Sequence, residues 1–236
     1  MTKQQKYIIL DFGLVLGKPK TGEWFITPNF FEILGTEEID LKRLRFLFNK
    51  FNAIISVKMT TREEEYEAFK KFYYNIITEL NITGNFKEQA EKLAQDFVYN
   101  EDKYAMYDDV YEFLSEESKK HTLILLSDNW PCVYNILKKW NIYDFFNKIY
   151  ISSEYCELKK DGKFFERPIN DFKIKENEAI FVDDNSDLLE VAEKKNLIPI
   201  LMDRANNYRQ FSKYRRIINL KEGVFYENIN SKWFTT

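Results

Sequence analysis

The chain has 236 residues, 44% hydrophobic and 31% charged, which is enough for a large folded domain with a smaller insertion and excludes general disorder. Its 35 Lys and Arg residues against 38 Asp and Glu give a net charge of -3, which excludes a strongly basic surface for nucleic acid. No apolar run approaches the ~20 residues of a membrane span, and the N-terminal run is too short for a secretory leader. We therefore expect neither a nucleic-acid partner nor membrane association.

Cysteine and histidine usage narrows the chemistry further. Cys132 and Cys156 lie far apart without a Cys-x-x-Cys pattern, which argues against a disulfide framework and a zinc site and fits a reducing, cytoplasmic compartment. The single histidine, His121, would have to serve any Ser-His-Asp triad, and no Gly-x-Ser-x-Gly motif accompanies it. Its place before an apolar run predicts a solvated residue at a strand entry.

The N-terminal half predicts one buried strand followed by helices. A continuous apolar run at residues 7–10 is typical of a strand covered on both faces, and Asp11 follows it directly. After a stretch rich in Gly and Pro, helical spacing of apolar residues begins near residue 40 and continues to about 103. Thr61 and Glu64 form a predicted capping box at the start of one helix, and another helix is predicted over 86–98. Residues 53–57 are ambiguous.

The C-terminal half alternates between helices and strands. This alternation predicts βαβ units, a parallel sheet and helices on both of its faces. An apolar-rich stretch covers residues 164–172, and residues 217–220 are a candidate for an edge strand. The predicted strands are 122–126, 148–151, 179–182 and 198–201, and the predicted helices are 107–119, 132–140 and 188–195.

Together these patterns predict an α/β fold with a three-layer, Rossmann-like parallel sheet core. Residues 1–17 and 106–236 would form the core, and residues 18–105 would form an all-helical domain inserted after the first strand. In open α/β sheets, ligands bind at the carboxyl ends of the strands. The search for a site therefore begins where the predicted strands end.

Three of the predicted strands end in polar residues: Asp11 after the first, Ser127-Asp128-Asn129 after the second, and Asp183-Asp184 followed by Asn185 after a later one. A single polar residue at a strand end is often the N-cap of the next helix. That explanation suffices for Ser127 or Asn185, but one cap needs only one carboxylate, and Asp11 enters a loop.

Carboxylates gathered at one sheet edge repel each other by about 4 kcal/mol per pair at 4 Å and an effective dielectric of 20. A divalent cation removes that repulsion, and oxygen ligands without His or Cys suit Mg²⁺. The residues therefore indicate a Mg²⁺-assisted phosphoryl-transfer site with one carboxylate free to act as a nucleophile. Lys159 and Lys160 are candidates to neutralise the phosphoryl group, although a solvated lysine pair is the stronger interpretation of the sequence alone.

In order along the chain, residues 8–16, 125–127, 152–161 and 181–184 resemble the four motifs of the haloacid dehalogenase superfamily, in its phosphatase-like branch with a helical cap. The resemblance implies that Asp11 is a nucleophile that becomes an aspartyl-phosphate. It implies that Asp184 ligates Mg²⁺ together with Asp11 and the backbone carbonyl of Gly13.

The same resemblance assigns roles to the other strand-end residues. Ser127 and Lys159 would hold phosphoryl oxygens, and Asp183 would be oriented by Lys159 and help to position the metal. Asp128 and Asn129, which follow Ser127, are expected to contribute to substrate binding. The expected catalytic residues are therefore Asp11, Ser127, Lys159 and Asp183.

The sequence departs from the family pattern at three positions. Gly13 stands where most family phosphatases carry a second Asp that serves as general acid and base, a function worth about 10²–10⁴-fold. Lys160 replaces a proline after Lys159, which predicts a looser turn. Leu188 replaces an Asn, with Asp187 as a possible substitute.

These observations predict a Mg²⁺-dependent phosphatase that acts on a small phosphorylated metabolite, of the sugar phosphate or nucleotide class. The helical insertion would close over the site, with Trp24, Phe25 and Trp130 as less favoured substrate contacts. Two alternatives stay open: a binding or regulatory protein that has lost turnover, and a metal-independent dehalogenase, against which the Asp183-Asp184 pair argues. The substrate and the oligomeric state are open as well.

Overall fold

The computed structural model describes residues 6–36, 39–207 and 212–222. Its main sheet has six parallel strands in the order β5-β4-β1-β6-β7-β8. The first strand, β1, therefore lies between two later strands, which explains why its four residues are all buried. The strands are β1 (Tyr7–Leu10), β4 (Thr122–Ser127), β5 (Lys148–Ile151), β6 (Ala179–Asp183), β7 (Ile198–Met202) and β8 (Arg215–Ile217).

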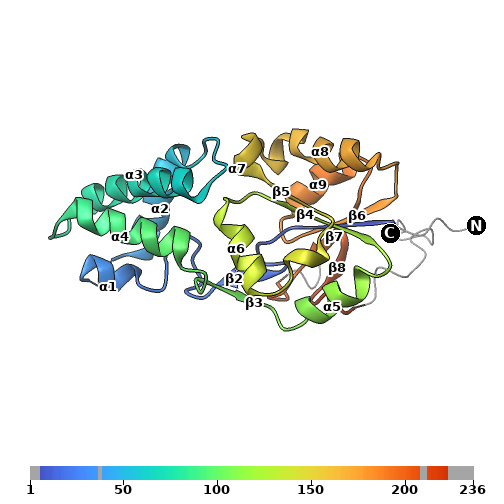
Figure 1. Ribbon diagram of the computed structural model, residues 1–236, viewed down its shortest axis with the longest axis horizontal. Helices are drawn as coiled ribbons and strands as arrows, with labels where there is room; N and C mark the ends of the chain where they lie inside the picture. Colours follow the sequence, from blue (N-terminus) through green and yellow to red (C-terminus); the bar gives the residue numbers. More distant parts are fainter. Residues whose placement is uncertain (1–5, 37–38, 208–211, 223–236) are drawn as a thin grey trace, which may run out of the picture.

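Helices cover both faces of this sheet (Figure 1). Alternate residues of β1 face opposite sides, so Ile8 packs in one hydrophobic cluster with α5 (Val110–Glu117) and α6 (Cys132–Lys139). Ile9 packs in another with α8 (Lys163–Phe172) and α9 (Ser186–Lys194). The predicted three-layer α/β core is confirmed. Short elements lie between these: η2 (Tyr143–Phe145), α7 (Ser152–Tyr155) and η3 (Lys159–Asp161).

Residues 20–103, called the helical segment below, form a separate hydrophobic cluster. Its core is strongly aromatic, and the rings of Phe69 and Phe97 stack with centroids 3.9 Å apart. The predicted capping box is present, because the Thr61 hydroxyl accepts the backbone N–H of Glu64 and the Glu64 carboxylate accepts the backbone N–H of Thr61. The helices are α1 (Phe30–Leu34), α2 (Leu41–Phe51), η1 (Asn52–Ile54), α3 (Arg62–Leu80) and α4 (Phe86–Tyr99).

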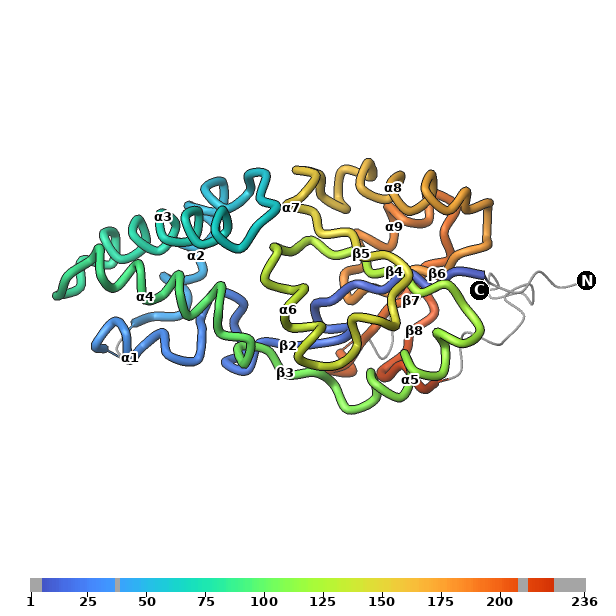
Figure 2. The backbone as a smooth tube through the Cα atoms, viewed as in Figure 1, coloured from blue at the N-terminus to red at the C-terminus, as the bar shows by residue number. Residues whose placement is uncertain are grey.

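A short two-stranded ribbon joins the helical segment to the core. Strands β2 (Gly17–Pro19) and β3 (Tyr104–Met106) pair antiparallel where the chain leaves and re-enters the core (Figure 2). Each predicted boundary of the inserted domain, after residue 17 and after residue 105, therefore falls inside a strand, so residues 18–19 and 104–105 are extended rather than helical. The sequence gives little signal for this ribbon, because each of its strands has only three residues and one of them contains Pro19.

Two stretches that the sequence leaves unassigned have definite structures, and two local expectations need correction. The apolar-rich stretch 164–172 lies in the helix α8, with Pro168 inside it, and the ambiguous stretch 53–57 contains the end of η1. The edge strand β8 begins at Arg215 rather than Ile217, and only Ile217 is shared with the prediction. His121 is buried rather than solvated, and its Nδ1 lies 2.8 Å from a carboxylate oxygen of Glu117. No helix among the described residues is long and apolar enough to cross a membrane.

Candidate active site

The carboxyl ends of β1, β4 and β6 open into a cleft of about 300 Å³. The helical segment lies beyond this end of the sheet (Figure 1). The lining combines polar strand-end residues with several aromatic rings. All eight residues expected to form the site line it: Asp11, Gly13, Ser127, Asp128, Asn129, Lys159, Asp183 and Asp184.

Asp11 is held at the end of the central strand. Its backbone N–H donates to the carbonyl oxygen of Val182, which extends the β1–β6 pairing by one step. Its Oδ2 accepts a hydrogen bond of 2.9 Å from the backbone N–H of Gly13, and its Oδ1 lies 2.8 Å from Nζ of Lys159. The side chain is 10% exposed. Asp11 is therefore fixed in orientation while still reachable from the cleft.

Lys159 is buried between two carboxylates. Its Nζ lies 2.8 Å from Asp11 and 2.6 Å from Oδ2 of Asp183, and the side chain is 2% exposed. Burial alone would lower the pKa of Lys159, but the negative charges of Asp11, Asp183 and Asp128 outweigh it and raise the pKa. Lys159 therefore stays protonated, and the sequence-based interpretation of a solvated lysine pair does not hold for it.

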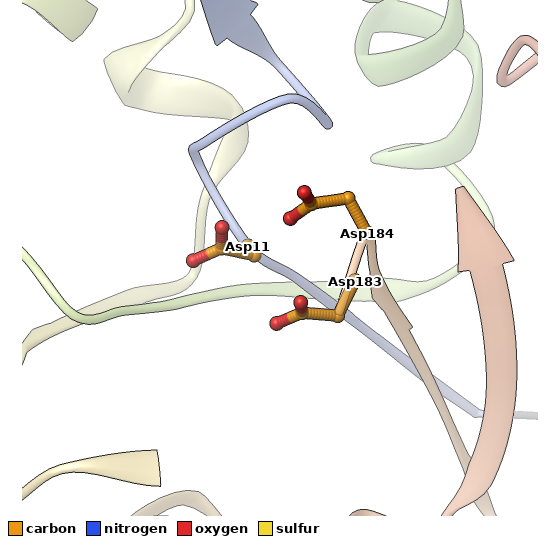
Figure 3. Close-up of side chains that lie close together, drawn as sticks. All are labelled: Asp11, Asp183 and Asp184. Atoms are coloured by element: carbon orange, nitrogen blue, oxygen red, sulfur yellow. The ribbon is translucent and has the colours of Figure 1, made fainter. Parts of the chain in front are cut away.

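Asp183 and Asp184 come from the end of β6 and point toward Asp11 (Figure 3). One carboxylate oxygen from each of the three residues lies within 4.8 Å of the others. Burial and the charges of Asp183 and Asp11 raise the pKa of Asp184 to about 7, and burial likewise raises the pKa of Asp183, whose Oδ1 also accepts the N–H of Asn185. Such crowded oxygens fit a hard divalent cation.

The β4–α6 loop supplies the remaining predicted residues. Ser127 is buried at the strand end, and Oδ1 of Asp128 accepts the backbone N–H of Lys159 at 3.1 Å. Burial raises the pKa of Asp128. The backbone N–H of Asn129 donates to Oγ of Ser152 at 3.1 Å. The loop is therefore tied to the element that carries Lys159, so Ser127 and Lys159 are positioned together.

The three departures from the family pattern have structural outcomes. Residues 159–161 form the short helix η3 without the proline, closed by a bond from the Gly162 N–H to the Lys159 carbonyl, so the turn is not loosened. Leu188 lines the cleft, whereas Asp187 is exposed and is not among the cleft-lining residues. Gly13 lies against the ring of Trp24.

Sequence reasoning missed part of the aromatic side of the cleft. Trp24, Phe25 and Trp130, which were not favoured as contacts, all line it. Tyr104 also lines it and was not singled out, because one Tyr at the end of a long helical stretch carries no local signal. Its position on β3, in the ribbon, brings it beside Trp24, with ring centroids 5.4 Å apart.

Comparison with known proteins shows the family of the chain. The haloacid dehalogenase-like hydrolase family matches residues 33–201, which is 169 of 236 residues. The match begins after Asp11 and Gly13, so the assignment of these two residues rests on the structure and on the sequence motif. No curated protein matches the sequence.

Solved structures share the fold at low sequence identity. A 2-haloacid dehalogenase from Pseudomonas syringae has a TM-score of 0.65 at 13% identity, covering 91% of this chain and 94% of its own. The HAD-hydrolase YfnB from Bacillus subtilis, bound to magnesium, has a TM-score of 0.66 at 12% identity over 93% and 97%. A HAD phosphatase from Thermococcus onnurineus has a TM-score of 0.58 at 15% identity, covering 91% of this chain and 94% of its own. From the family match over most of its length, the chain belongs to the haloacid dehalogenase-like hydrolases.

Proposed function

We propose that the protein is a Mg²⁺-dependent phosphatase that hydrolyses a small phosphorylated metabolite through an aspartyl-phosphate on Asp11. The observation that carries the proposal is the convergence of Asp11, Asp183 and Asp184 around one point, with Lys159 as the one cation that lines the cleft among the described residues. Four carboxylates against one ammonium leave an excess of negative charge. A bound divalent cation neutralises that excess, whereas an anionic substrate that entered the cleft without a cation would be repelled.

Asp11, Asp184 and the backbone carbonyl of Gly13 would hold the ion. When bound, Mg²⁺ polarises the phosphoryl group and screens the charge of the attacking carboxylate. A carboxylate oxygen of Asp11 forms a bond to phosphorus while the bond to the leaving oxygen breaks. Water then attacks the aspartyl-phosphate and releases phosphate and the Asp11 carboxylate. Ser127 and the ammonium of Lys159 hold phosphoryl oxygens during both steps.

The helical segment is proposed to act as a cap that limits the size of the substrate. The cleft holds about 300 Å³, at the lower end of the ~300–1,000 Å³ range of small-molecule sites. Trp130 of the core packs against Phe25, Phe69 and Phe97, with centroid distances of 5.2–6.0 Å. The β4–α6 loop is therefore anchored in the helical segment, which favours a small metabolite over a macromolecular substrate.

Two other functions remain as alternatives. A dehalogenase would also use Asp11 as the nucleophile, and a structural relative is described as a 2-haloacid dehalogenase. The buried Asp183 and the half-buried Asp184 argue against it, because they would repel a departing halide unless a cation were present. A protein without turnover is opposed by the retention of three crowded carboxylates, two of them buried, whose mutual repulsion is costly.

The proposal is tested with purified protein and p-nitrophenyl phosphate, with and without Mg²⁺. Asp11→Asn should abolish phosphate release, whereas Glu65→Gln, which also changes a buried carboxylate to an amide but lies outside the cleft, should retain it. Chloride release from a 2-haloacid without added metal would instead favour the dehalogenase. Absence of both activities in a folded protein that binds Mg²⁺ would favour the non-catalytic alternative.

A further inference from the structure

The space beside the nucleophile is filled by the indole ring of Trp24. A Cβ atom placed on Gly13 would lie 3.2 Å from both Cη2 and Cζ2 of Trp24 and 3.4 Å from Oδ2 of Asp11. The backbone of Gly13 does not adopt a left-handed conformation, so the requirement at this position is for space. A side chain at residue 13 therefore requires the indole to shift by a few tenths of an ångström at its first carbon alone.

Trp24 is not free to move aside. Its ring packs edge-on against Tyr104 at 5.4 Å, and Tyr104 is itself 3% exposed and packs against Phe12 at 5.5 Å. The backbone on the other side is also fixed, because the N–H of Leu14 donates to the carbonyl of Gly17 and Gly13 bridges to Gly17. Gly13 and Trp24 are therefore a matched pair that closes this wall of the cleft.

The residues around the leaving group determine whether it can be protonated as it departs. In an in-line displacement the leaving oxygen is opposite the attacking oxygen, and Asp11 lies on the strand-end side of the cleft. The aromatic residues that line the cleft include Trp24, Phe25 and Trp130, and none of these three can donate an acidic proton at neutral pH. An alkoxide leaving group without such a donor departs about 10²–10⁴-fold more slowly.

The other titratable groups that line the cleft do not supply the missing proton donor. Lys159, Asp11 and Asp183 are joined by ion pairs, and Asp184 belongs to the proposed metal site. Burial raises the pKa of Tyr104 well above its ordinary value, so its hydroxyl is a weak acid. Asp128 already accepts the backbone N–H of Lys159.

We infer that Trp24 is a specificity-determining residue, which restricts the enzyme to phosphoryl compounds whose leaving group is stable as an anion. These are aryl, enol and acyl phosphates, and the flat face of such a group can pack on the indole. The inference rests on the proposed phosphatase function. In the first step the leaving oxygen departs with the electron pair of its bond to phosphorus, as a phenolate, enolate or carboxylate, and takes up any proton later from water.

The test compares kcat/KM for a series of aryl phosphates, acetyl phosphate and glycerol 2-phosphate, all with Mg²⁺. We expect the rate to fall steeply with rising leaving-group pKa, so that glycerol 2-phosphate is slower than p-nitrophenyl phosphate by at least about 10²-fold. Equal rates would overturn the inference while leaving the phosphatase function intact. No hydrolysis of any compound would overturn both.

Variants at the pair sharpen the test. Gly13→Asp alone should lower the melting temperature and leave glycerol 2-phosphate a poor substrate, since the indole of Trp24 occupies the space that the introduced carboxylate needs. The double change Gly13→Asp with Trp24→Ala should raise hydrolysis of glycerol 2-phosphate relative to p-nitrophenyl phosphate by about 10-fold or more. Recovery by Gly13→Asp alone with an unchanged melting temperature would contradict the pairing. A selective loss of alkyl phosphate hydrolysis in Asp128→Asn would identify Asp128 as an acid and contradict the inference.

Discussion

Two of the clusters of polar side chains in the described part of the chain differ in their charge balance and in their access to the cleft. At the sheet edge, Lys159 pairs with Asp11 and Asp183, and Asp184 lies beside these two carboxylates. Where the helical segment meets the core lies a second group, the junction cluster, formed by Glu65, Lys103 and Cys132. There, Glu65 accepts the backbone N–H of Cys132 at 2.7 Å, and Nζ of Lys103 lies 3.1 Å from the Cys132 sulfur.

Burial and titration do not distinguish the two clusters. Burial raises the pKa of Glu65 to about 7, and burial with neighbouring charge does the same for Asp184. The difference lies in charge balance and access. Glu65 is 0% exposed, lies near the positive charges of Lys103 and Arg62, and accepts the backbone N–H of the first residue of α6. The sheet-edge carboxylates instead outnumber their lysine and open into the cleft. A raised pKa alone therefore does not set the proposed active site apart from the junction cluster, whereas excess negative charge at an open cleft does.

The largest difference between the clusters should come from removing each lysine. Lys159→Met should lower phosphatase kcat/KM by about 10²–10³-fold, because the charge that stabilises the phosphoryl group is lost. Lys103→Met should leave kcat within a few-fold but lower the free energy of unfolding by about 3–5 kcal/mol, because Glu65 loses its counter-charge. Steady-state kinetics and urea unfolding measure the two effects. Loss of activity in Lys103→Met at full stability would remove the distinction.

Mg²⁺ should act on one cluster only. At a concentration of 100 times its Kd, the ion should raise the free energy of unfolding by about 2.7 kcal/mol, because it binds the folded state. Asp184→Asn should abolish this stabilisation, and Glu65→Gln should keep it. Differential scanning calorimetry with and without Mg²⁺ provides the measurement. An equal Mg²⁺ effect in all three proteins would show that the ion binds elsewhere.

The junction cluster should give the most gradual effect, a pH dependence of stability at saturating Mg²⁺ that is spread over more than two pH units. Glu65 has a folded pKa of about 7, above the ordinary 4.5, so the folded state binds more protons between these pH values. Stability from this group should therefore fall as pH rises from 4.5 to 7, by at most about 1.4 kcal/mol per pH unit. Glu65→Gln should flatten the curve of unfolding free energy against pH. An unchanged slope in that variant would assign the titration to another group.

Much of the fold follows from local patterns in the sequence. The apolar run at residues 7–10 and the later run at 179–182 predict buried parallel strands, because continuous apolar residues need cover on both faces. Asp11 and Asp183 follow those runs directly, so the sheet edge that holds the carboxylates could be predicted before any coordinates. The capping box at Thr61 is equally local.

Tertiary structure decided which side chains meet across the chain. The sequence favours a solvated Lys159, but folding buries it between Asp11 and Asp183, which lie 148 and 24 positions away. Likewise, nothing near Gly13 predicts that Trp24 fills the space beside it, and nothing near Glu65 predicts that it caps α6. The physical reason is that periodicity and capping report contacts within a few residues, whereas these partners are set by how the helical segment packs on the core.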